Sequence, residues 1–172
     1  AQHAWDDRFN LMKVKRLGPS LIPTEFIVPA AELAGVLQDL AKRIKQPLVI
    51  EGMLLSGNGR PAQVIMLGFI PHDERTFGFN LAYASSLTAV KVAKEHGGRA
   101  YTTGLYFAGE AEAVLGADRL AALKAHKAQV DPADLLNPGK VFLNGVGATR
   151  RMSFLMGTAQ RFEPVVRPFA NL

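Results

Sequence analysis

The feature that most constrains the fold of this sequence is a regular apolar pattern over residues 29–44, with extended segments on both sides. Its apolar residues recur at the spacing of a helix that buries one face, and they are Leu33, Val36, Leu37, Leu40, Ala41 and Ile44. Pro29 stands where prolines favour helix starts, and Gln46-Pro47 ends the pattern. Residues 20–28 and 48–55 have the apolar and β-branched composition of strands. The pattern therefore predicts a strand–helix–strand unit.

A second unit of the same kind follows. The sequence Ser56-Gly57-Asn58-Gly59 carries the Asn-Gly signal of a hairpin, and residues 62–70 form an apolar strand after it. A long helix is predicted over residues 71–96, with Gly97-Gly98 as its C-terminal cap, and a fourth strand over 99–105. This order predicts an α+β fold of the ferredoxin-like βαββαβ type, with an antiparallel sheet and helices on one face.

The sheet face without helices is expected to need a cover. We expect this open face to be strongly apolar, through Leu48, Ile50, Val64 and Met66. The terminal segments or a neighbouring domain are therefore predicted to lie against it. In the N-terminal segment 1–18, a short amphipathic helix stopped by Gly18-Pro19 is predicted from the spacing of Trp5, Phe9, Leu11 and Met12.

The charge distribution argues against a nucleic-acid partner. The formal net charge is +5, but residues 1–16 contribute +2 and residues 149–172 contribute +3. The body between them has twelve charged residues of each sign and so lacks the positive field that phosphate backbones require. An RNA-binding sheet is further disfavoured because no strand combines basic residues with an aromatic pair.

Several absences narrow the chemistry and the location. There is no cysteine, which excludes disulfides and cysteine-ligated metals and fits a reducing compartment. No apolar run is long enough to form a transmembrane segment, and the amino end lacks a signal peptide. We therefore expect a cytoplasmic protein, with peripheral membrane contact left open. The missing initiator methionine predicts a piece of a longer polypeptide.

The most unusual local chemistry lies in residues 130–142. Asp131-Pro132 and Asn137-Pro138-Gly139 are two turn signals that fix the backbone at short spacing. Taken alone, they are typical of a chain leaving a helix. The preceding residues predict a short helix over 110–115 and a helix capped by Asp118, with inward-facing residues at Leu120, Leu123 and Val130.

The run from Asp118 to Phe142 resembles the C-terminal end of the FAD-linked oxidase family. The resemblance extends to the flavoprotein of glycolate oxidase and to D-lactate dehydrogenase, within the vanillyl-alcohol oxidase type. It is carried by Asp118-Arg119-Leu120, Leu123-Lys124, Lys127, Asp131-Pro132 and Leu136-Asn137-Pro138-Gly139-Lys140-Val141-Phe142. The resemblance implies that residues 19–142 form a cap, or substrate, domain.

The resemblance also implies the partners and the cofactor. FAD would be bound mainly by an FAD-binding domain that belongs to the same polypeptide and is absent from this chain. Hydride would pass from a small hydroxyacid or alcohol to the flavin, with this domain closing the substrate pocket. The tail, residues 143–172, is expected to lead into a missing module, such as the iron–sulfur electron-transfer domain of some relatives.

The sequence departs from the family at its metal site. Many members carry two histidines in the hairpin after the second strand and a Gly-Glu-His-Gly segment on the fourth. Here the hairpin, residues 51–60, has no histidine, and the strand reads Tyr101-Thr102-Thr103-Gly104-Leu105-Tyr106. Methionine and leucine cannot replace imidazole as ligands, so we expect no metal. This departure leaves the α-hydroxyacid chemistry open. His3, His72, His96 and His126 are expected to be structural or solvated.

The candidate site residues follow from both arguments. The resemblance places Asn137 and Lys140 near the flavin, and a surface cation is the alternative for Lys140. Hydroxyl groups of Tyr101, Thr102 and Thr103 can meet a substrate, or can face water. As catalytic groups we consider Glu51, an exposed strand-edge carboxylate or a buried base, and Tyr106. The arginines that could bind a substrate carboxylate are Arg8, Arg16 and Arg60.

A second class of function remains open at this point. A stand-alone ferredoxin-like module could bind a metabolite or a second copy of itself on its sheet, without catalysis. The two hypotheses differ in what the upstream coding region contains, since only the first requires a flavin-binding domain there.

Overall fold

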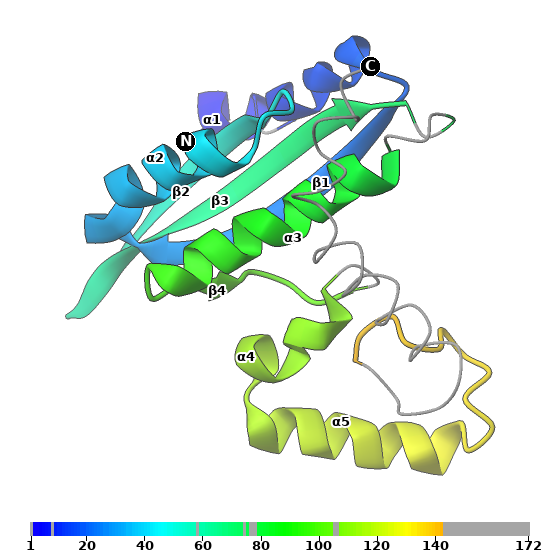
Figure 1. Cartoon of the computed structure of the whole chain (residues 1–172). Helices are drawn as coiled ribbons and strands as arrows, with labels where there is room; N and C mark the ends of the chain where they lie inside the picture. The colour runs from blue at the N-terminus through cyan, green and yellow to red at the C-terminus, as the bar shows by residue number, and fades with distance from the viewer. Residues whose placement is uncertain are drawn as a thin grey trace.

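The structure is a computed structural model, and it shows a sheet with helices packed on it and a helical extension beyond one edge (Figure 1). It describes residues 2–7, 9–57, 59–73, 75, 79–104 and 107–142. Arg8, Leu105, Tyr106 and the tail 143–172, with a helix expected over 151–162, lie outside the described residues.

The four strands are antiparallel neighbours in the order β2-β3-β1-β4. They are β1 (Ser20–Pro29), β2 (Val49–Gly57), β3 (Arg60–His72) and β4 (Arg99–Ala100). β1 and β3 form the centre of the sheet and pair from Ser20↔His72 to Pro29↔Gln63, along the whole of β1. This long ladder makes β1 and β3 the rigid base on which the other elements are placed.

Two helices cover one face of the sheet (Figure 1). They are α2 (Leu33–Arg43), preceded by the 3-10 turn η2 (Ala30–Glu32), and α3 (Phe79–Glu95). The main core lies between this helix layer and the sheet, and its largest members include Phe26, Val28, Val36, Leu40, Met66 and Phe107. The α+β class and the antiparallel sheet are confirmed, and the order β1-α2-β2-β3-α3-β4 is the one expected from the sequence.

The prediction of the open face was wrong in its residues. Leu48, Ile50, Val64 and Met66 pack in the core under the helices, on the opposite face from the one expected. Strand alternation then puts Val49, Glu51 and Met53 on the open face. The misassignment arose because a strand buried on both faces reads as a continuous apolar run, in which alternation is hidden.

The N-terminal segment supplies part of the cover for the open face. It forms α1 (Gln2–Asp6) and the 3-10 helix η1 (Asn10–Leu17), which contacts β2 and β3. Val14 is the buried residue of η1. The amphipathic pattern predicted for this segment was wrong in its apolar face, since Trp5, Phe9 and Met12 are exposed.

Two element boundaries also differ from the predictions. β3 continues through His72, and α3 begins at Phe79 rather than at Pro71, because β1 offers backbone partners as far as Ser20. β4 ends at Ala100 instead of Leu105. One more ladder bond runs from Tyr101 N to the Glu25 carbonyl, and the chain then turns away at Gly104, whose φ is +136°.

Small residues let α3 approach the sheet closely. Thr24 and Ser86 are both fully buried and tie β1 to α3. The Thr24 hydroxyl donates to the Ser86 carbonyl at 3.3 Å, and the Ser86 hydroxyl donates to the Pro23 carbonyl. Ser85 donates to Gln46 Oε1 at 2.9 Å. The serines that interrupt this apolar helix are therefore satisfied hydrogen-bonding groups of the core.

The end of α3 is a glycine cap, as predicted. Gly97 has φ +73°, Gly98 N donates to Ala93 O at 2.7 Å, and Gly97 N donates to Lys94 O at 3.1 Å. This pair of bonds is the Schellman arrangement. Gly98 also lies against β1, since a Cβ built on it would stand 2.3 Å from the Ile27 carbonyl oxygen.

The helical extension consists of η3 (Ala108–Glu110), α4 (Ala111–Leu115) and α5 (Ala117–Val130). Gly116, not Asp118, is the N-cap residue of α5, and it makes no side-chain capping bond. Leu120 is buried as predicted, but Leu123 and Val130 are exposed. None of the helices in the described part of the chain has the length and apolar character that a membrane crossing requires.

We predict that Gly98→Ala lowers the free energy of unfolding by about 1–3 kcal/mol, because the new methyl group overlaps the β1 backbone. Gly52→Ala is the matched control, since its Cβ meets only side-chain atoms of Met66 and Val64, at 3.2 and 3.3 Å. Urea denaturation of both variants checks this. Equal stability of Gly98→Ala and the unmodified chain would contradict the close approach.

Candidate functional site

Residues 130–142, which we call the clasp, are organised by one carboxylate. Asp131 is only 7% exposed and accepts hydrogen bonds from the backbone N–H groups of Leu135 and Leu136, at 2.9 and 2.8 Å. It also accepts a hydrogen bond from the ammonium group of Lys127. The carboxylate thus closes a loop between the last turn of α5 and the clasp.

Lys127 and Asp131 stabilise each other's charged forms. Lys127 further donates to the Leu136 carbonyl at 2.5 Å and pairs with Asp134 at 3.1 Å. The hydrogen bond from Lys127, with those from Leu136 and Leu135, lowers the pKa of Asp131 to about 2. The same hydrogen bond to Asp131 raises the pKa of Lys127. The clasp is therefore held by a charged network at neutral pH.

The backbone of the clasp has an unusual path. Asp134, Asn137 and Gly139 have φ angles of +51°, +48° and +68°. Aspartate and asparagine are the non-glycine residues that tolerate this left-handed region best. Lys140 N donates to the Asn137 carbonyl at 3.3 Å, which closes the turn around Pro138. Asn137 and Lys140 are both exposed on this turn.

A shallow groove of about 230 Å³ lies between α5 and the clasp. Its walls are mainly apolar and combine Leu123 and Val130 of α5 with Leu136, Val141 and Phe142 of the clasp. Asn137 also lines it. Phe142 is anchored in a small buried cluster with Ala111 and Leu120, which fixes the end of the clasp on α4 and α5.

The structure brings the hydroxyl-rich end of β4 next to the clasp. A Cβ built on Gly104 would lie 3.9 Å from the Lys140 carbonyl oxygen. Tyr101, Thr102 and Thr103 directly precede Gly104, so the two groups predicted from different parts of the sequence meet in one region. Tyr101 is 38% exposed, and Thr102 and Thr103 are half-buried.

Glu25 is a site residue that the sequence analysis missed. The Thr102 hydroxyl donates to Glu25 Oε2 at 2.8 Å, and the backbone N–H of Tyr101 donates to the Glu25 carbonyl at 3.2 Å. Glu25 is half-buried in the central strand β1. A carboxylate between Thr24 and Phe26, inside a strand of otherwise apolar neighbours, was the available signal.

Glu51 lies on the open face but far from this region. The register places Glu51 opposite Leu67, and Leu67 opposite Glu25, with Tyr101 beyond Glu25. Three strand spacings of about 4.8 Å put Glu51 about 14 Å from Tyr101 along the row. Glu51 is exposed on the edge strand β2, and Arg16 and Arg60 are exposed in η1 and at the start of β3.

The described residues contain no group of three histidine, cysteine, aspartate or glutamate side chains that could hold a metal ion. His72, at the end of β3, accepts a hydrogen bond at Nδ1 from the Asp73 N–H at 2.9 Å. The functional groups near the clasp are therefore an amide, a cation, hydroxyls and one carboxylate.

The fold and this region define an α+β domain with one partly uncovered sheet face and a rigid polar turn beside one edge of the sheet. The chain belongs to the FAD-linked oxidases, C-terminal domain family, whose pattern it matches over residues 1–141. The match includes the N-terminal segment as well as the sheet, α5 and most of the clasp. Comparison with curated proteins and with solved structures gives no match.

We predict that Asp131→Ala loosens the clasp while the sheet stays folded. Amide exchange at Leu135 and Leu136 should accelerate by about tenfold or more, since both N–H groups lose a charged acceptor. Hydrogen exchange followed by NMR measures this. Asp134→Ala, which removes an ion pair to Lys127 but leaves Asp131 in place, is the control.

The lowered pKa of Asp131 sets the direction of a pH effect on the same amides. Its contribution is complete above the unfolded value of 3.8 and is lost as the pH falls through about 2. Protection of Leu135 and Leu136 that ended well above pH 4 would contradict the role of this carboxylate.

Proposed function

We propose that this chain is the substrate-cap domain of an FAD-dependent oxidase or dehydrogenase, working with an FAD-binding domain of the same polypeptide. The observation that carries the proposal is the family match over residues 1–141. The placement of the clasp beside the end of β4 supports it, because it joins the two groups of residues that such a site would use.

The clasp carries groups that fit a flavin. An isoalloxazine ring has a polar edge that hydrogen bonds and positive charge can stabilise, and large apolar faces. Asn137 offers an amide, Lys140 offers a cation, and both are exposed on a turn held by Asp131. The groove beside them supplies apolar surface. When bound, FAD supplies the hydride acceptor of the reaction.

The end of β4 carries groups that fit the hydroxyl of a small hydroxyacid or alcohol. We assign Tyr101, Thr102 and Thr103 to substrate binding. Because the Thr102 hydroxyl already donates its proton to Glu25, its lone pairs are left to accept a hydrogen bond from a substrate hydroxyl. Glu25 acts through Thr102 and is a positioning residue. Glu51, being at the opposite edge of the sheet, is less well placed than Glu25 for this region.

The decisive experiment for the cofactor uses the polypeptide encoded by the complete gene. We predict that it carries FAD and that Lys140→Ala slows flavin reduction by the best substrate about tenfold, as expected for one lost charge-assisted hydrogen bond. Stopped-flow absorbance of the flavin band measures this. Lys124→Ala, on the exposed surface of α5, is the matched control. A complete polypeptide without flavin would overturn the proposed function.

The substrate assignment has a separate test. Thr102→Val keeps the side-chain shape and removes the hydroxyl that joins Glu25 to the substrate. We expect KM for the alcohol or hydroxyacid to rise about tenfold in the complete polypeptide, while flavin content stays unchanged. Thr88→Val is the control, since the Thr88 hydroxyl donates only to the Ala84 carbonyl within α3. An unchanged KM in Thr102→Val would place the substrate elsewhere.

A further inference from the structure

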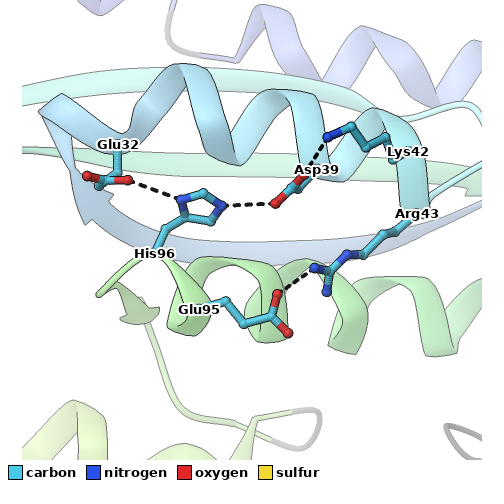
Figure 2. Close-up of polar contacts among 6 residues, drawn as sticks. All are labelled: Glu32, Asp39, Lys42, Arg43, Glu95 and His96. Atoms are coloured by element: carbon cyan, nitrogen blue, oxygen red, sulfur yellow. Dashed lines mark hydrogen bonds and ion pairs between the residues drawn. The ribbon is translucent and has the colours of Figure 1, made fainter.

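A second charged cluster lies on the opposite side of the sheet from the open face, between the two helices that cover the core. His96 directly follows α3, and Figure 2 shows its ring pointing between two carboxylates of the α2 segment. His96 Nδ1 lies 3.1 Å from Glu32 Oε2, and Nε2 lies 3.1 Å from Asp39 Oδ2. The His96 side chain is only 19% exposed.

The α2 segment is shaped to receive this ring. Glu32 and Asp39 stand three residues before and four residues after Gly35, so the three share one helix face. A Cβ built on Gly35 would lie 2.8 Å from His96 Cε1, which means that any larger residue there would displace the ring. Glu32 is the N-cap residue of α2, yet it makes no capping bond with its side chain. Its carboxylate is used by His96 instead.

The geometry fixes the protonation state that the cluster needs. Ionised carboxylates only accept hydrogen bonds, so each ring nitrogen must carry a proton to donate to its partner. A neutral imidazole has only one N–H and would turn a lone pair towards the other carboxylate. Both contacts together therefore require the imidazolium form of His96.

The surrounding charges are consistent with this requirement. Lys42 pairs with Asp39 at 3.0 Å, and Arg43 of α2 pairs with Glu95 of α3 at 2.6 Å (Figure 2). Lys91 of α3 acts on Glu95. Hydrogen bonds to Glu32 and then to Asp39 raise the pKa of His96, against the effect of burial. Lys42 first, and then His96, lower the pKa of Asp39.

We propose that His96, Glu32 and Asp39 form a proton-controlled clamp that joins α2 to the end of α3. The clamp is closed when the ring is protonated and opens when the proton is lost. A pKa raised by folding gives a stabilisation that is complete below the unfolded value of 6.5 and is lost as the pH rises through the folded value. The helix layer is therefore tighter in mildly acidic than in alkaline conditions.

NMR titration of the His96 Cε1–H signal and urea unfolding of the 172-residue chain between pH 5.5 and 9 test the clamp. The range starts at 5.5 because carboxylates as a class titrate below it. We expect the His96 pKa to exceed 6.5. The difference in urea midpoint between the unmodified chain and His96→Gln should be largest at pH 5.5 and should shrink towards pH 9. His126→Gln, on the exposed surface of α5, is the control and should show no such trend.

Two further variants keep the histidine and so remain informative if His96→Gln fails to fold. Asp39→Asn removes one charge with little change in shape and should lower the pKa of His96 relative to the unmodified chain. Gly35→Ala displaces the ring and should do the same. A His96 pKa at or below 6.5 in the unmodified chain, or one unchanged in both variants, would overturn the proposal. None of these measurements involves flavin, so their failure would leave the proposed function untouched.

Discussion

The structure depends on the antiparallel pairing of β1 with β3. This ladder runs along all of β1, and the strands on its two sides are added to it as edges. Because side chains alternate along a strand, β1 serves two purposes at once. Phe26 and Val28 build the core under the helices, while Glu25 points to the open face and holds Thr102. A shift of register by one residue would bury Glu25 and expose the core, so the pairing sets both stability and site.

The sequence predicted the elements better than their contacts. Helix spacing and the glycine cap located α2 and the end of α3, since these signals are local. The assignment of Leu48 to the open face failed because alternation is hidden in strands that are apolar throughout. The length of β3 could not be found either, because it depends on pairing with residues about fifty positions earlier in the chain. Long-range pairing is information that local patterns do not contain.

The candidate site shows the same division. Turn chemistry predicted a rigid clasp, and the prolines and left-handed residues are there, but the group that holds it is Asp131, which the sequence analysis treated only as the partner of Pro132. The meeting of the clasp with the end of β4 also required the fold. Gly104 turns the chain out of the sheet, the ion pair between Lys94 and Glu110 joins α3 to η3, and Phe142 anchors the clasp on α4 and α5.

Two charged networks thus act at the two ends of one mechanical path. Asp131 fixes the clasp, and His96 fixes the end of α3 from which the chain enters β4. Their titrations have opposite sense, since the clasp loses its support on acidification and the clamp loses its support when the pH rises. Between these limits, both ends of the segment that carries Tyr101 and Thr102 are held. A cap that must present hydroxyl groups to a partner domain benefits from this, because a hydrogen-bonding site positions a substrate only when its own backbone is fixed.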